Sequence, residues 1–151
     1  TKNHIKGDID VNAKVLVYGT VATINSGAYQ DVFKGYDLSV LATSELASGI
    51  ETEDQIIIDE EVDNLVDSLL TNKITHLFLG CTHFPLIEEY LEKRLSGMGV
   101  KIINPATYVA KEVRGLEKGD LKVDFYTTKI NEIWNKRVSE FPENSLNEVI
   151  L

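Results

Sequence analysis

Short apolar runs alternate with amphipathic segments along most of this 151-residue chain, and this alternation restricts the possible folds more than any other feature. Two of the runs end at a glycine, Gly19 and Gly80, as buried strands of parallel sheets often do. The repeated order of strand and helix is typical of βαβ units, in which neighbouring strands run in the same direction. The sequence therefore predicts an α/β fold with three layers, α/β/α, around a mainly parallel sheet.

The expected strands cover residues 14–19, 37–42, 75–79, 100–103, 121–126 and 148–151. The expected helices cover residues 26–34, 59–70, 85–95, 105–113 and 130–138. The helix from Asp59 is predicted from one apolar stripe at helical spacing, formed by Val62, Leu65, Val66, Leu69 and Leu70. Residues 20–27 are expected to form a loop with a helix N-cap, and residues 43–58 fit a loop, a short broken helix or a strand.

Charge and cysteine content exclude several classes of function. A formal net charge of −9 argues against binding to nucleic acid or to an anionic membrane surface. No apolar run approaches the ~18 residues that a membrane-spanning helix needs. The single cysteine can form neither an intramolecular disulfide nor a Cys-x-x-Cys metal site, and a lone thiol suits a reducing cytoplasm.

The candidate site is the stretch that follows the apolar run ending at Leu79, where Gly80, Cys81, Thr82 and His83 succeed one another. In open α/β sheets, ligands bind at the carboxyl ends of the strands. The start of a following helix would stabilise the thiolate form of Cys81, and His83 could exchange a proton with it. Thr82 offers a hydroxyl and a backbone N–H to a ligand carboxylate.

Other interpretations of this stretch remain open at this point. A single cysteine is often a buried residue that only fills space. A self-contained thiol hydrolase or acyl transferase would use Cys81 and His83 with a third residue that orients the imidazole, and the sequence does not identify that residue. A non-catalytic domain that binds a small acid, or only a partner, is the third alternative. His4 and His76 receive no role.

Three segments give the chain a more specific resemblance. The residues Gly80-Cys81-Thr82-His83-Phe84-Pro85-Leu86 resemble the second catalytic-cysteine motif of bacterial glutamate racemases. Residues 19–29, which begin Gly-Thr and end Asn-Ser-Gly-Ala-Tyr, resemble the start of the second lobe of that family, and residues 102–106 resemble its next strand and helix.

The resemblance implies a cofactor-independent, metal-free racemase that interconverts L- and D-glutamate with two cysteine bases. It implies that Cys81 is one base, that His83 tunes it, that Thr82 binds the substrate carboxylate and that Glu51 lies near the substrate amine. It further implies that the product D-glutamate supplies peptidoglycan synthesis in a bacterial cytoplasm.

The chain departs from the family in lacking a second cysteine and the Cys-Asn-Thr segment of the first lobe. We therefore expect residues 1–104 to form the second lobe and residues 105–151 to form a C-terminal segment that packs on the first lobe. On its own the chain is expected to be inactive. Apolar surface on residues 105–151 is expected to cause dimerisation or poor solubility.

Overall fold

The structure is a computed structural model that describes residues 9–113, 123–130, 132–140 and 144–149. The chain divides into two compact units, residues 1–114 and 115–151. In the first unit the elements are β1 (Lys14–Thr20), α2 (Val21–Asn25), α3 (Ala28–Val32), β2 (Asp37–Thr43), α4 (Leu46–Thr52), α5 (Gln55–Asn72), β3 (His76–Leu79), the 3₁₀ helix η1 (Phe84–Ile87), α6 (Glu88–Arg94), β4 (Lys101–Ile103) and α7 (Pro105–Val113). The second contains β5 (Val123–Thr127), α8 (Glu132–Val138) and β6 (Asn144–Glu148).

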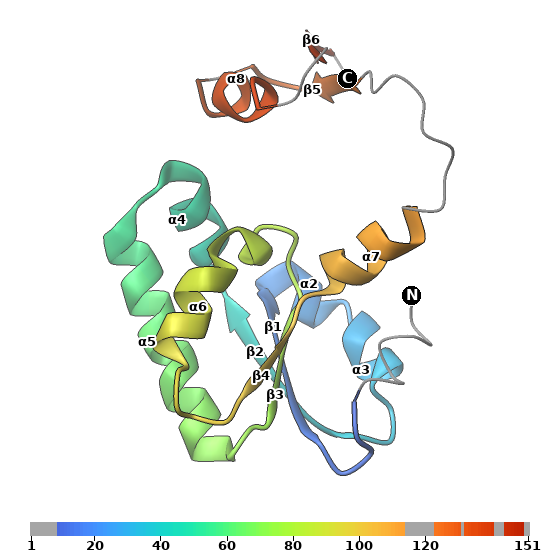
Figure 1. Ribbon diagram of the computed structural model, residues 1–151, viewed down its shortest axis with the longest axis vertical. Helices are drawn as coiled ribbons and strands as arrows, with labels where there is room; N and C mark the ends of the chain where they lie inside the picture. Colours follow the sequence, from blue (N-terminus) through green and yellow to red (C-terminus); the bar gives the residue numbers. More distant parts are fainter. Residues whose placement is uncertain (1–8, 114–122, 131, 141–143, 150–151) are drawn as a thin grey trace. The chain divides into compact units, whose positions relative to one another are not determined.

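The sheet of the first unit has the strand order β2-β1-β3-β4, and all of its neighbouring strands are parallel (Figure 1). In the second unit β5 and β6 also pair in parallel. The predicted α/β fold with a mainly parallel sheet is therefore confirmed. The expected last strand lies a few residues earlier than predicted, at 144–148, and residues 150–151 lie outside the described part.

Alternate residues of β1 face the two sides of the sheet and so form two separate cores. Leu16 and Tyr18 belong to one core with side chains of α4, α5 and α6, whereas Val15 and Val17 belong to the other with side chains of α2 and α3. Figure 1 shows α4, α5 and α6 together on one side of the sheet and α2 and α3 on the other. The three predicted layers thus follow from the pleat of the central strand.

Helix α5 begins at Gln55, earlier than the apolar stripe predicted. The carboxylate of Asp54 caps it by accepting hydrogen bonds from the backbone N–H groups of Ile56 and Ile57 at 3.0 and 3.3 Å. The extension brings Ile58 into the buried row. Leu70, at the other end of the predicted stripe, is 60% exposed. The buried row of the helix therefore ends at Leu69.

Two further helices occupy segments that the sequence left as loop or undecided. Helix α2 covers residues expected to be a loop, and its N-cap is Thr20, whose hydroxyl accepts a hydrogen bond from the Thr23 N–H at 3.3 Å. Helix α4 lies in the undecided segment and ends at Glu53, which adopts the left-handed conformation with φ 56°. Neither helix carries enough periodic apolar residues to be recognised, because each is shorter than two and a half turns.

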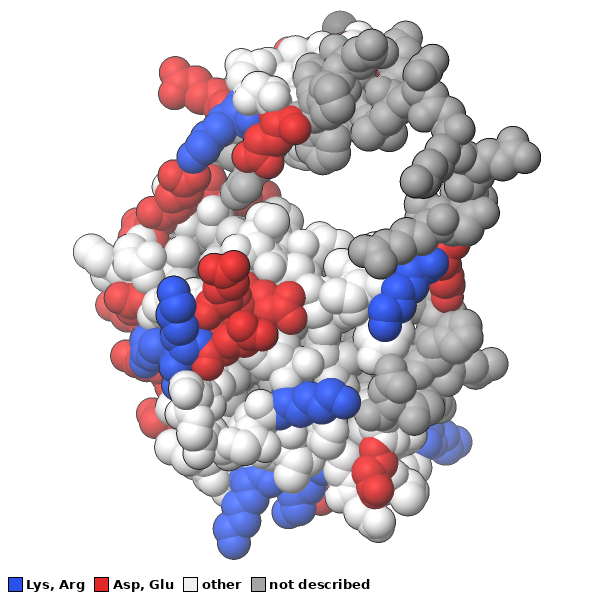
Figure 2. All heavy atoms as spheres, in the orientation of Figure 1, with Lys and Arg blue, Asp and Glu red and all other residues white. Residues whose placement is uncertain are grey.

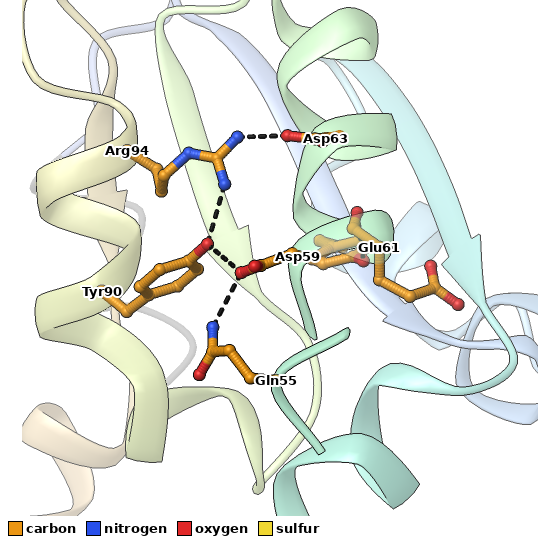
Figure 3. Close-up of polar contacts among 7 residues, drawn as sticks. Gln55, Asp59, Glu61, Asp63, Tyr90 and Arg94 are labelled. Carbon is orange, nitrogen blue, oxygen red and sulfur yellow. Dashed lines mark hydrogen bonds and ion pairs between the residues drawn. The ribbon is translucent and has the colours of Figure 1, made fainter. Parts of the chain in front are cut away.

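A network of polar side chains joins α5 to α6 on the surface (Figure 3). The Tyr90 hydroxyl donates to a carboxylate oxygen of Asp59 at 2.5 Å, and the Gln55 amide donates to the same oxygen at 2.7 Å. Arg94 donates to the Tyr90 hydroxyl at 2.7 Å and pairs with Asp63. These donors, Tyr90 first and Gln55 second, hold the pKa of Asp59 below its ordinary value.

Charged side chains are interspersed on the face drawn in Figure 2, where basic residues lie among acidic and uncharged ones. Within the described residues, no helix has both the length and the apolar character needed to cross a membrane.

The α5–α6 network predicts how Asp59 titrates. Replacing Tyr90 by Phe removes the largest stabilising contact of the ionised carboxylate, so the pKa of Asp59 should rise. Because the folded-state pKa lies below the unfolded value of about 3.9, ionised Asp59 stabilises the fold at neutral pH. That contribution is lost as pH falls through the folded-state pKa, and Y90F should make the loss smaller. Carboxyl-carbon NMR titration measures this directly.

The control is Tyr126→Phe, which removes an exposed hydroxyl from β5 and should leave the Asp59 titration unchanged. An Asp59 titration that is the same in Y90F as in the unsubstituted chain would contradict the assigned role of the hydroxyl.

Candidate active site

Strand β3 carries the chain to the carboxyl edge of the sheet, and Gly80, the next residue, lies tightly against β1. The Gly80 N–H donates to the Tyr18 carbonyl at 2.7 Å. A Cβ atom on Gly80 would lie only 2.9 Å from that same oxygen and 3.3 Å from the ring of Tyr29. Glycine is therefore required here for the packing of β3 against β1, and Cys81 follows directly at the edge where α/β proteins bind ligands.

The chain then turns before the next helix begins. The Phe84 N–H donates to the Cys81 carbonyl at 3.3 Å, and η1 starts at Phe84 with Pro85 in its first turn. Phe84 is fully buried, with its ring centroid 5.0 Å from that of Tyr18. A 3₁₀ turn thus anchors the segment in the core, and α6 begins only at Glu88, later than the sequence predicted.

The side chains of Cys81, His83 and Glu51 form a chain of hydrogen bonds. The Cys81 Sγ lies 3.6 Å from Nδ1 of His83, and Nε2 of the same ring lies 2.6 Å from Oε1 of Glu51 on α4. Because a carboxylate only accepts, Nε2 is the nitrogen that carries the proton when the ring is neutral, and Nδ1 is then the unprotonated nitrogen beside the thiol. The imidazole can then take the thiol proton, while Glu51 stabilises the imidazolium that results.

A cavity of about 590 Å³ opens beside Cys81. It lies between the turn after β3 and helix α7, and its lining is mainly apolar: Tyr29, Leu79, Gly80, Cys81, Thr82, Pro85, Pro105, Ala106, Val109 and Ala110. Thr82, which is exposed, adds a hydroxyl to the lining. The arrangement can admit a small molecule to the thiol and offer it hydrogen bonds from one side.

Tyr29 is a cavity residue that the sequence did not single out for the site. Its ring packs on Phe78 with 5.2 Å between centroids. Burial and, second, electrostatic interaction with Cys81 raise the pKa of Tyr29, so the phenol keeps its proton and can donate a hydrogen bond. In the sequence, only its position at the end of the motif of residues 19–29 could have indicated that Tyr29 belongs to the site.

The structure brings together three of the four residues predicted for the site, Cys81, His83 and Glu51, and places Thr82 at the cavity. His76 lies at the other end of β3, where its Nδ1 is 2.9 Å from the Thr75 hydroxyl, and His4 lies outside the described residues. In the described part of the chain, no group of three or more His, Cys, Asp and Glu side chains has the arrangement of a metal site.

Comparison with known proteins gives a consistent family. The family model described as Asp/Glu/Hydantoin racemase matches residues 3–113. A glutamate racemase from Carboxydothermus hydrogenoformans is 32% identical over 139 residues, covering 82% of this chain and 51% of that protein. One from Corynebacterium glutamicum is 36% identical over 120 residues, covering 75% of this chain and 43% of that protein. The chain thus spans about half the length of the curated relatives it matches.

Solved structures show the same fold. A glutamate racemase isoform from Bacillus anthracis superposes with a TM-score of 0.70 at 26% identity, covering 99% of this chain and 63% of that one. The enzyme from Francisella tularensis, solved with D-glutamate, gives a TM-score of 0.73 at 24% identity, covering 99% of this chain and 62% of that one. With the family model matched over most of its length, the chain belongs to the Asp/Glu/hydantoin racemase family.

Proposed function

We propose that this chain is the second lobe of a glutamate racemase and supplies one of its two thiol bases. The observation that carries the proposal is the Cys81–His83–Glu51 hydrogen-bond chain, whose Cys81 lines a cavity, in a member of this family. The named relatives are glutamate racemases, which favours glutamate as the substrate.

The proposed reaction is a proton transfer at the α-carbon of glutamate. The Cys81 thiolate removes the α-proton from one face, and the electron pair left on the carbon is stabilised by hydrogen bonds to the adjoining carboxylate. A second thiol on the opposite face delivers a proton and so inverts the centre. These 151 residues contain a single cysteine, so the second thiol must come from a polypeptide segment outside them.

The other site residues take supporting roles in this proposal. His83 holds the proton released by Cys81, and Glu51 keeps the imidazole oriented and attracts the substrate ammonium group. Thr82 donates its hydroxyl and backbone N–H to the substrate carboxylate. The chemistry uses no metal or cofactor. By the family resemblance, the D-glutamate formed supplies peptidoglycan and cell-wall synthesis in a bacterial cytoplasm. Exposed apolar side chains of residues 105–151, such as Val109 and Tyr126, favour a homodimer.

A thiol hydrolase or acyl transferase is the second candidate function, and one observation favours it. Glu51 is the orienting third residue that such an enzyme requires, at 2.6 Å from His83. The family match favours the racemase, because it covers residues 3–113 and therefore the whole site.

We predict that the isolated 151-residue chain does not racemise glutamate. One thiol can exchange the α-proton on a single face, but inversion requires a base on each face. Circular dichroism of L-glutamate and of D-glutamate, followed over hours with the purified chain, should show no change in optical activity. Sustained turnover by the isolated chain would contradict its assignment as half of an active site.

In a two-lobe protein that contains this chain, Cys81→Ser should lower racemisation in both directions. A serine hydroxyl is a much weaker acid and base than a thiol, and loss of a general base typically costs about a hundredfold to ten-thousandfold in rate. Initial rates from each enantiomer measure the effect. Ser96→Ala, an exposed position in the turn after α6, is the control and should retain full activity. Unchanged rates in C81S would remove Cys81 from the mechanism.

A further inference from the structure

Asn104 connects the end of β4 to the start of α7 and is 9% exposed. Its side chain makes two hydrogen bonds of different kinds. The amide Nδ2 donates to Oε2 of Glu88 at 2.6 Å, and Oδ1 accepts from the Ala106 N–H at 2.9 Å. The first bond reaches another element, and the second caps α7. The side-chain amide of Asn104 therefore fixes the first residue of α7 and also connects α7 to Glu88 of α6.

Glu88 is the first residue of α6 and follows η1 directly, so it lies on the segment that continues from Cys81. That segment forms one wall of the cavity through Cys81, Thr82 and Pro85. The other wall includes α7, which contributes Pro105, Ala106, Val109 and Ala110. The Glu88–Asn104 hydrogen bond thus joins the two segments that carry these walls of the cavity.

The bond is suited to holding these walls at a set distance. Its acceptor is a carboxylate, and hydrogen bonds to charged groups are shorter and stronger than those between neutral groups. Its donor is a buried amide, for which loss of the partner would leave an unsatisfied N–H. Apolar contacts of α7, such as the packing of Tyr108 against the core, can slide, whereas this bond has one favourable length and direction.

We propose that Glu88 and Asn104 are a positioning pair that sets the width of the cavity beside Cys81 and thereby the size of molecule that reaches the thiol. The proposal deepens the proposed function, because it takes this cavity as the site of the reaction. Neither residue of the pair lines the cavity, so the pair acts through α7 and not by touching the substrate.

Alkylation of the single cysteine reports on this width without any substrate. The full chain is treated with iodoacetamide, a small reagent, and with N-(1-pyrenyl)maleimide, a bulky aromatic one, and the two second-order rate constants are measured. Their ratio cancels changes in the thiolate population that affect both reagents. Since no glutamate is present, a failure of the racemase proposal would leave this readout intact.

Asn104→Asp keeps the oxygen that caps α7 but replaces the donor to Glu88 by a second carboxylate. We expect the bulky-to-small ratio to rise about tenfold, the effect of losing one hydrogen bond to a charged group. Glu88→Gln keeps a neutral acceptor for Asn104, so the bond is weakened and not lost, and the ratio should rise less than in N104D. The double variant N104D/E88Q exchanges donor and acceptor, retains the formal charge of the unsubstituted pair, and should restore the original ratio.

Glu89→Gln is the matched control, because it removes the same charge from the next, exposed position of α6 and should leave the ratio unchanged. Near-ultraviolet circular dichroism checks that each variant is folded. If N104D does not fold, Glu88→Ala replaces it, since it removes the acceptor and leaves the α7 cap intact; the same rise is expected. A ratio within twofold of the original in the folded variant, or a double variant that is not restored, would overturn the proposal.

Discussion

The close pairing of β3 with β1 is the constraint on which the site depends. The two strands approach so closely at their carboxyl ends that only glycine fits at position 80, and the Gly80 N–H reaches the Tyr18 carbonyl at 2.7 Å. Phe84 then packs on the Tyr18 ring and anchors the turn from its other side. Cys81 is held between these two buried anchors and itself packs against the same core, which gives the thiol a defined position.

Around this fixed thiol, the polar groups come from elements that are distant in sequence. His83 lies on the same turn, but Glu51 comes from α4, a helix packed on one face of the sheet. The cavity is closed by α7 and by Tyr29 of α3, which belong to the side of the second core. The site therefore contains residues from both helical layers. The proposed Glu88–Asn104 pair sets the position of α7, one wall of the cavity, and leaves the position of Cys81 unchanged.

The sequence predicted the strands of the sheet and the position of Cys81 at the end of a strand. It predicted less well which residues surround Cys81. Apolar runs identified the strands because burial on both faces leaves little choice of residue, and the parallel order followed from the alternation with helices. Glu51 was aligned only through the family resemblance, since α4 is too short to show a period and 32 positions separate the residue from His83. The hydrogen bond from Asn104 to Glu88 could not be predicted from the sequence. An asparagine before a helix is expected as an N-cap, and nothing in the sequence indicates a second partner for its side chain.

The central claim is that Cys81 lies in a site that binds glutamate, and differential alkylation tests it most directly on the chain itself. Iodoacetamide labelling of Cys81 is followed by intact mass spectrometry with increasing D-glutamate, L-glutamate or, as a control, L-lysine. If Cys81 lies in such a site, both enantiomers of glutamate slow labelling in a saturable manner and L-lysine does not. Labelling at the same rate with and without glutamate, in a folded chain, would contradict the account.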